Sequence, residues 1–104
     1  MDTAKEILQV LTTYGDTMRE KFSVRRIGLF GSRLRDQARP ESDIDLLVEL
    51  DEPTFDHYMD LKFFLEDLLK SQVDLVLADS VKPRLRPYIQ REVVYAQGLP
   101  PLSG

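Results

Sequence analysis

The amino-acid sequence predicts an α/β (α+β) domain. Three observations carry this prediction: helix-like and strand-like patterns alternate along the chain, no repeat or low-complexity tract interrupts them, and 42% of the residues are hydrophobic. The chain has 104 residues, which gives room for one hydrophobic core of ordinary size. We therefore expect a single domain over residues 1–104, with a flexible tail over about residues 97–104.

The spacing of apolar residues justifies each element in turn. An amphipathic helix is expected over 3–21, ending near Gly15 or somewhat beyond it, because apolar residues recur there at spacings of three and four. The next expected elements are strands over 24–30 and 44–50, a helix over 55–69, a strand over 73–78 and a last helix that begins near Pro83. Pro87 is compatible only with the first turn of that last helix.

Composition and charge exclude several classes of function. The formal net charge is -4, so the chain has no overall basic surface for duplex nucleic acid. It contains no cysteine, which excludes disulfides and thiolate chemistry, and its one histidine, His57, is expected to be a solvated surface residue. The apolar runs are too short to span a membrane and the N-terminus lacks the pattern of a signal peptide, so the cytoplasm is the expected location.

Two aspartates stand at the start of the expected strand over 44–50. Side chains of an extended chain alternate between faces, so Asp43 and Asp45 point the same way. Two carboxylates this close repel each other unless a cation lies between them, and Mg²⁺ prefers carboxylate, water and phosphate oxygens. The pair alone leaves a second interpretation open, in which Ser42 and Asp43 cap a turn and Asp45 is a solvated strand end.

Gly31 and Ser32 end the preceding strand and have the chemistry to hold a phosphate. A glycine lets the backbone approach a ligand closely, and a serine offers both its hydroxyl and its N–H group. Arg33, Arg35 and Arg39 follow, and guanidinium groups match the geometry of phosphate oxygens. A plain turn followed by a solvated basic loop is the alternative at this point.

A third acid, Asp74, lies within the apolar strand pattern over 73–78 and shares a face with Val76. Burying an unpaired acid is costly, so Asp74 lies either in water at a strand end or beside a site that also holds metal ions. In the second arrangement it could bind a metal and take the proton from an attacking hydroxyl as a general base.

The spacing of these motifs resembles a known signature. Gly31-Ser32, ten further residues and then Asp43-Ile44-Asp45 are similar to the GS-x10-D-x-D signature of the polymerase β-like nucleotidyltransferase superfamily. Within that superfamily the chain most resembles the minimal nucleotidyltransferases, or MNT-domain proteins, over nearly its whole length. The resemblance implies the polymerase β-like nucleotidyltransferase fold, with a small mixed β-sheet flanked by helices.

The resemblance also implies a role for each motif residue. The implied catalytic residues are also the ligands of two expected Mg²⁺ ions: Asp43, Asp45 and Asp74. The implied nucleotide-binding residues are Gly31, Ser32, Arg33 and Ser42. Two positions depart from the family pattern, since Leu34 and Asp36 stand where the family often has alanine and glycine. Asp36 could weaken phosphate binding by repulsion between like charges.

The activity implied by the resemblance is Mg²⁺-dependent transfer of AMP from ATP to a hydroxyl group. Free-standing MNT proteins resemble antitoxins that attach AMP to a tyrosine of a HEPN-domain toxin, so we expect a HEPN toxin as partner in a type VII-like toxin–antitoxin system. Two alternatives remain open: modification of a small molecule such as an antibiotic, and a non-catalytic antitoxin that acts by binding. The sequence leaves base preference, acceptor residue, the number of AMP units and self-association open.

Overall fold

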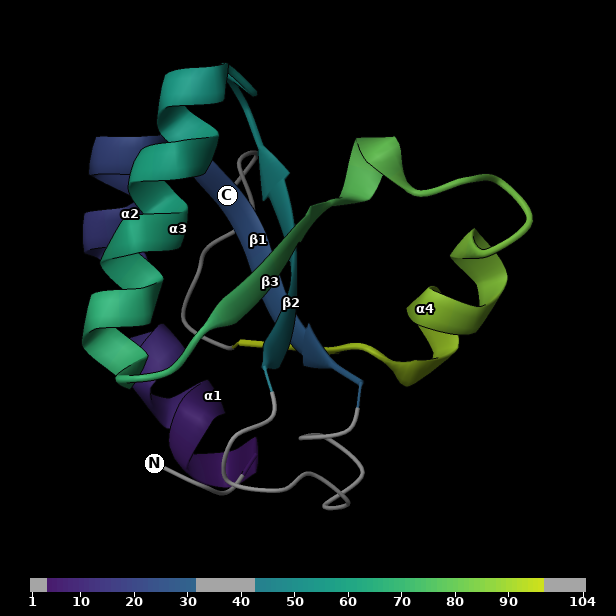
Figure 1. Ribbon diagram of the computed structural model, residues 1–104, viewed down its shortest axis with the longest axis horizontal. Helices are drawn as coiled ribbons and strands as arrows, with labels where there is room; N and C mark the ends of the chain where they lie inside the picture. Colours follow the sequence, from purple (N-terminus) through teal and green to yellow (C-terminus); the bar gives the residue numbers. More distant parts are fainter. Residues whose placement is uncertain (1–3, 32–42, 97–104) are drawn as a thin grey trace.

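The fold is a four-stranded β-sheet with helices on both faces (Figure 1). A computed structural model describes residues 4–31 and 43–96. In chain order the elements are α1 (Ala4–Thr13), α2 (Gly15–Phe22), β1 (Val24–Phe30), β2 (Ile44–Leu50), α3 (Phe55–Leu69), β3 (Val73–Leu77), a 3-10 turn η1 (Ala78–Ser80), α4 (Arg86–Glu92) and β4 (Val94–Tyr95). The α/β class and the small mixed sheet flanked by helices, both expected from the sequence, are confirmed.

The strands lie in the order β3-β2-β1-β4. β1 pairs antiparallel with β2 and with β4, whereas β2 pairs in parallel with β3. A parallel pair needs a crossover connection, which is supplied by α3. As a result, the start of β2 and the start of β3 lie at the same end of the sheet, beside the end of β1.

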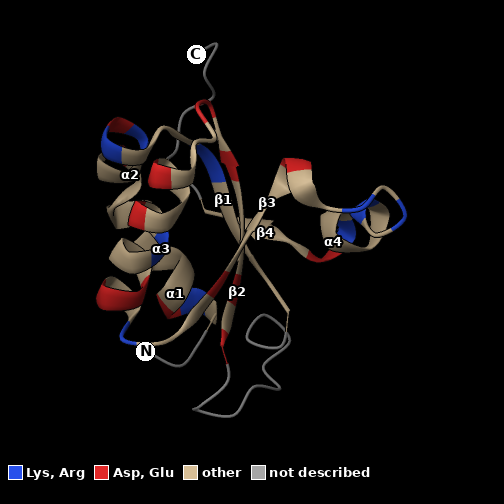
Figure 2. Cartoon of the chain, turned by 45° about the horizontal axis from the view of Figure 1, so that its top comes forward, with Lys and Arg blue, Asp and Glu red and all other residues tan. Residues whose placement is uncertain are grey.

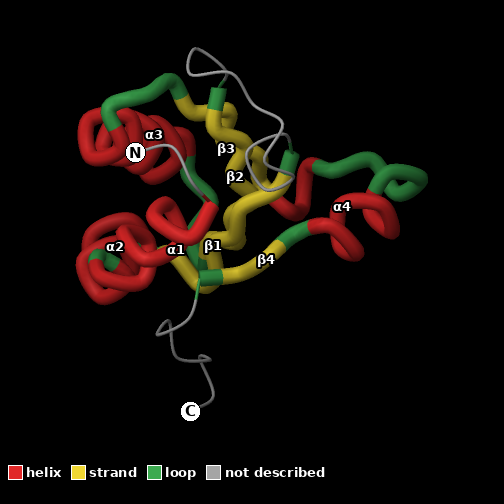
Figure 3. The backbone as a smooth tube through the Cα atoms, turned by 90° about the horizontal axis from the view of Figure 1, so that it is seen from below, coloured by secondary structure: helices red, strands yellow, loops and turns green. Residues whose placement is uncertain are grey.

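The hydrophobic core lies between one face of the sheet and helices α1, α2 and α3 (Figure 3). Alternate residues of the strands face this core, as expected for strands that pack against helices on one side. The fully buried side chains are Ile7, Leu11, Met18, Val24, Ile27, Leu29, Ile44, Leu46, Val48, Leu61, Leu65 and Leu69. The opposite face, here called the open face, carries Asp45, Leu47 and Glu49 of β2.

The N-terminal region forms two helices where the sequence pattern predicted one over 3–21. The break lies at Tyr14, whose backbone (φ -98, ψ 13) leaves the helical region. Backbone hydrogen bonds continue across the break, from Tyr14 N–H to Val10 C=O and from Met18 N–H to Tyr14 C=O. Gly15 therefore begins α2 and does not end the first helix. The apolar periodicity survives because both helices keep their buried residues against the same sheet.

Helix α3 has the bounds that the sequence predicted. It begins after Thr54, whose side chain accepts a hydrogen bond from the His57 N–H at 3.1 Å, an N-cap that satisfies one of the free donors of the first turn. It ends at Lys70, which adopts the left-handed conformation (φ 56) common at helix C-termini. Among the described residues no helix is both long enough and apolar enough to cross a membrane.

The C-terminal segment differs from its prediction. The helix expected from Pro83 onward is confined to α4, and Val94 and Tyr95 form a short edge strand on β1. Valine and tyrosine favour extended backbone, which explains the change from helix to strand. β4 can lie this close because β1 has Gly28 opposite it: a Cβ there would lie 2.6 Å from Val93 Cγ2 and 3.0 Å from the Val94 carbonyl oxygen.

Candidate functional site

Three of the sequence-predicted site residues meet at one end of the open face. In the β2–β3 register Asp45 is the direct partner of Asp74, and in the β1–β2 register it is the partner of Phe30, which precedes Gly31. Residues in register on adjacent strands have their Cα atoms about 5 Å apart and their side chains on the same face. Asp45 is half-buried and Asp74 is exposed. The parallel pairing thus brings together two carboxylates that are far apart in the sequence.

Gly31 lies directly against the carboxylate of Asp45. Its backbone has φ +82, in the left-handed region that favours glycine. A Cβ atom at this position would overlap Oδ2 of Asp45. The glycine of the GS motif therefore has a structural reason in this fold: the backbone that leaves β1 passes through the space beside the acid of β2.

Asp43 lies at the same end of the sheet, one residue before β2. Its side chain is exposed. The chain is anchored at this point by a hydrogen bond from the Ile44 N–H to the Gln72 carbonyl, 2.9 Å long, which ties the start of β2 to the residue before β3. We name the three residues Asp43, Asp45 and Asp74 the acidic end; Figure 2 colours the acidic residues red.

The remaining predicted nucleotide-binding residues, Ser32, Arg33 and Ser42, lie outside the described residues. The same holds for Arg35, Asp36 and Arg39, and for the expected tail over 97–104. Their predicted roles stay predictions.

The donor set of the acidic end fits a hard divalent cation. Within residues 4–31 and 43–96, no group of three or more His, Cys, Asp or Glu side chains is placed close enough to hold a metal ion. The register nonetheless pairs two carboxylates, Asp45 and Asp74, beside Gly31, which has no side chain where it contacts Asp45. Carboxylate oxygens supplemented by water and phosphate are the usual ligands of Mg²⁺. The assignment of Asp43 as a further ligand stays a prediction.

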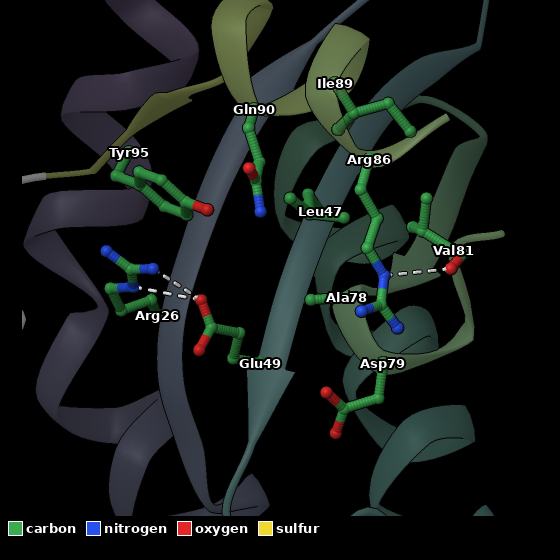
Figure 4. Close-up of a pocket in the computed structure, with 10 residues that line it drawn as sticks. All are labelled: Arg26, Leu47, Glu49, Ala78, Asp79, Val81, Arg86, Ile89, Gln90 and Tyr95. Carbon is green, nitrogen blue, oxygen red and sulfur yellow. Dashed lines mark hydrogen bonds and ion pairs between the residues drawn. The ribbon is translucent and has the colours of Figure 1, made fainter. Parts of the chain in front are cut away.

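A cleft of about 170 Å³ opens farther along the same face, between the sheet and α4 (Figure 4). We call it the α4 cleft. The residues that line it are Arg26, Leu47, Glu49, Ala78, Asp79, Val81, Arg86, Ile89, Gln90 and Tyr95. α4 has no buried residue, so it stands off the sheet and forms one wall of the cleft.

Several polar groups of the α4 cleft contact one another or the backbone. Arg26 donates to Oε2 of Glu49 through Nη2 at 2.7 Å and Nε at 3.0 Å, and its guanidinium lies 4.2 Å from the centre of the Tyr95 ring. The hydrogen bond with Glu49 raises the pKa of Arg26 above its usual value. On the opposite side, Nε of Arg86 donates to the Val81 carbonyl at 3.2 Å.

Sequence reasoning did not find the α4 cleft. Tyr95, which follows α4, lies on an edge strand and lines the cleft. The run Val93-Val94-Tyr95 is β-prone and could have indicated this strand. His57 also differs from its prediction: it is half-buried, and its Nδ1 lies 2.7 Å from the Glu52 carbonyl oxygen and 3.3 Å from Ser23 Oγ.

Comparison with known proteins identifies the family. A model of the nucleotidyltransferase domain matches residues 12–96. Protein adenylyltransferase MntA of Thermococcus cleftensis is 43% identical over 96 residues, which cover 91% of this chain and 97% of the relative. A solved structure described as a "putative minimal nucleotidyltransferase" matches with a TM-score of 0.73 at 36% identity, covering 86% of this chain and 92% of that one.

A more distant match concerns the fold alone. It is a chain from the solved complex of a tri-AMPylated Shewanella oneidensis HEPN toxin with an MNT antitoxin, with a TM-score of 0.61 at 22% identity, covering 88% of this chain and 72% of that one. The family-model match and the 43% identity extend over most of this chain, and both include the GS-x10-D-x-D region. The chain therefore belongs to the nucleotidyltransferase domain family and is a minimal nucleotidyltransferase enzyme.

Proposed function

We propose that this enzyme transfers AMP from ATP to a hydroxyl group of a partner protein. The observation that carries the proposal is the in-register pair Asp45 and Asp74 beside Gly31, in a chain 43% identical to a protein adenylyltransferase. In the reaction, a hydroxyl oxygen of the acceptor forms a bond to the α-phosphorus of ATP. The bond from that phosphorus to the bridging oxygen breaks, and pyrophosphate leaves. Such reactions depend mainly on positioning and charge neutralisation.

The residues at and around the acidic end would have different roles, which follow from their positions. Gly31 would bring its backbone against the triphosphate at this end of the sheet, because it has no side chain. Asp74 is exposed on the outermost strand of the described sheet, where an acceptor hydroxyl can approach from solvent, and its carboxylate would take the proton. Ser32, Arg33 and Ser42 would contact the phosphates.

Asp43, Asp45 and Asp74 would hold Mg²⁺. Bound there, Mg²⁺ would neutralise phosphate charge and stabilise the attacking and departing oxygens. Without the cation, the negative charges of the carboxylates and of the triphosphate repel each other, so the acidic end disfavours ATP alone.

The proposed acceptor is a tyrosine of a HEPN-domain toxin, which makes the enzyme an antitoxin of a type VII-like system. Two similarities support this: the relative of known activity modifies proteins, and a protein of the same fold is found in complex with an AMPylated HEPN toxin. A small molecule is the less favoured acceptor, because the relative that is 43% identical is a protein adenylyltransferase.

The decisive experiment is intact-mass spectrometry. The enzyme is incubated with ATP and Mg²⁺, alone and with the HEPN-domain protein encoded by the neighbouring gene. We expect a mass gain on the partner equal to a whole number of AMP units. The variant Asp43→Ala with Asp45→Ala should lose the gain while keeping partner binding.

A matched control removes two acids from the opposite side of the sheet. Asp60 and Asp67 are exposed on α3, so Asp60→Ala with Asp67→Ala changes the net charge equally and should keep the mass gain. A stable complex without any mass gain would refute the transferase proposal and favour neutralisation by binding. If the Asp43/Asp45 variant still neutralised the toxin in cells, this would also refute the transferase proposal and favour neutralisation by binding.

A further inference from the structure

The α4 cleft lies on the same face of β2 as the acidic end. Asp45, Leu47 and Glu49 alternate along β2 and face the same way. Two residues of a strand span about 6.6 Å, so the floor of the cleft at Leu47 begins one side chain beyond Asp45. A nucleotide whose phosphates lie at the acidic end therefore has its sugar and base within reach of the cleft.

The charges of the cleft do not favour a phosphate group. Its two arginines, Arg26 and Arg86, are matched by two acids, Glu49 and Asp79. Arg26 is already engaged by Glu49, with a short bond of 2.7 Å. A cleft without net positive charge favours a neutral ligand over an anion.

The lining of the cleft combines apolar side chains with a few polar groups, as suits an aromatic heterocycle. Its apolar lining is formed by Leu47, Ala78, Val81 and Ile89, of which Leu47 and Val81 are buried. Gln90 projects from α4 toward the sheet, and Tyr95 lies at the side of the cleft next to Arg26 (Figure 4). Apolar walls with a few polar groups are typical of small-ligand sites.

We infer that the α4 cleft binds the adenine base of the nucleotide and that Gln90 recognises its edge. The inference rests on the proposed function, which supplies ATP as the substrate, and it assigns the base preference that the motif residues leave open. A glutamine amide can accept a hydrogen bond from the N6 amino group of adenine and donate one to its N7, whereas the same edge of guanine carries two acceptors, O6 and N7. Gln90 is a specificity residue in this account and touches no reacting atom.

Binding of the base would also stabilise α4, which makes few packing contacts of its own. This helix has seven residues, none of them buried, so little packing holds it. A base between α4 and the sheet would cover Ile89 and Gln90 on one side and lie against the buried Leu47 on the other. We therefore expect the amide groups of α4 to exchange hydrogen more slowly when ATP is bound.

The test compares the dissociation constants of ATP and GTP, measured by calorimetry with Mg²⁺ and without partner protein. Both nucleotides carry the same triphosphate, so their ratio isolates the base. Gln90→Arg offers donors only, which match O6 and N7 of guanine and leave the adenine amino group without an acceptor. We expect it to shift the ATP/GTP preference toward GTP by about tenfold. Gln90→Leu should weaken ATP binding and leave GTP binding nearly unchanged.

The control is Gln9→Leu, because Gln9 is exposed on α1, on the other side of the sheet. It should leave both dissociation constants and their ratio unchanged. Hydrogen exchange over Arg86–Glu92 gives a second readout: ATP should slow it in the unchanged enzyme and in Gln9→Leu, and much less in Gln90→Leu.

The outcomes separate the inference from the proposed function. An unchanged ATP/GTP ratio in both Gln90 variants, or equal weakening of both nucleotides, overturns the inference while AMP transfer to the partner can still be measured. A Gln90-dependent ratio without any transfer refutes the proposed function and keeps the base site. Slower exchange in α4 on addition of the partner protein alone would assign the cleft to the partner instead.

Discussion

Gly31 and Asp45 are in direct contact across β1 and β2, although the two residues belong to different halves of the GS-x10-D-x-D signature. The contact shows why the two halves occur together. The turn at the end of β1 needs a residue without a Cβ, since any side chain would enter the space of the Asp45 carboxylate. The turn that follows β1 and the acid of β2 are thus parts of one structural unit.

Gly31→Ala tests this unit. The substitution places a Cβ against Asp45 and forces alanine into a positive φ, which costs about 1–2 kcal/mol. We expect a lower free energy of unfolding by about that amount and near-complete loss of AMP transfer at a temperature where the variant is folded. Chemical denaturation and the mass-gain assay measure the two effects. Transfer at an unaltered rate would show that Asp45 can move without consequence.

Removal of divalent cations tests the chemistry of the acidic end. With EDTA we expect no transfer, and added Mg²⁺ should restore it, because carboxylates and triphosphate repel without a cation. Asp45→Asn should raise the Mg²⁺ concentration needed for half-maximal transfer. Asp60→Asn on α3 should leave it unchanged. Full activity in EDTA would refute the role assigned to the acidic end.

The Arg26–Glu49 pair should contribute little stability. The side chains are 52% and 24% exposed, and ion pairs in such positions typically contribute about 0–1 kcal/mol. A double-mutant cycle with Arg26→Gln and Glu49→Gln measures the coupling. The hydrogen bond with Glu49 raises the pKa of Arg26, so the folded protein keeps Arg26 charged at every pH below its unfolded pKa. The coupling energy between Arg26 and Glu49 should therefore be constant from about pH 7 to about pH 9. A coupling energy that decreases between these pH values would contradict a raised pKa of Arg26.

Thr54→Ala tests the start of α3. Loss of the hydrogen bond that Thr54 accepts from the His57 N–H should lower the free energy of unfolding by about 1 kcal/mol. Thr13→Ala is a suitable control, because the Thr13 hydroxyl donates within α1 to the Gln9 carbonyl and caps no helix N-terminus. Urea denaturation of both variants gives the comparison. Equal stability of Thr54→Ala and the unchanged protein would show that water replaces the cap.

The sequence by itself determined the local structure and the signature. The bounds of β1, β2 and α3 follow from apolar periodicity, and the spacing of Gly31, Ser32, Asp43 and Asp45 indicated the family. The break at Tyr14 and the strand β4 were not predicted, because packing against the sheet continues the apolar spacing of α1 into α2 and pairs Val94 and Tyr95 with β1.

Only the tertiary structure decided which residues lie side by side. Asp74 meets Asp45 because β2 and β3 pair in parallel, and this register depends on the crossover through α3 and on a shared core. The α4 cleft has the same origin, since its lining comes from three strands, η1, Val81 and α4. Such contacts join residues far apart in the chain, so local sequence periodicity carries no information about them.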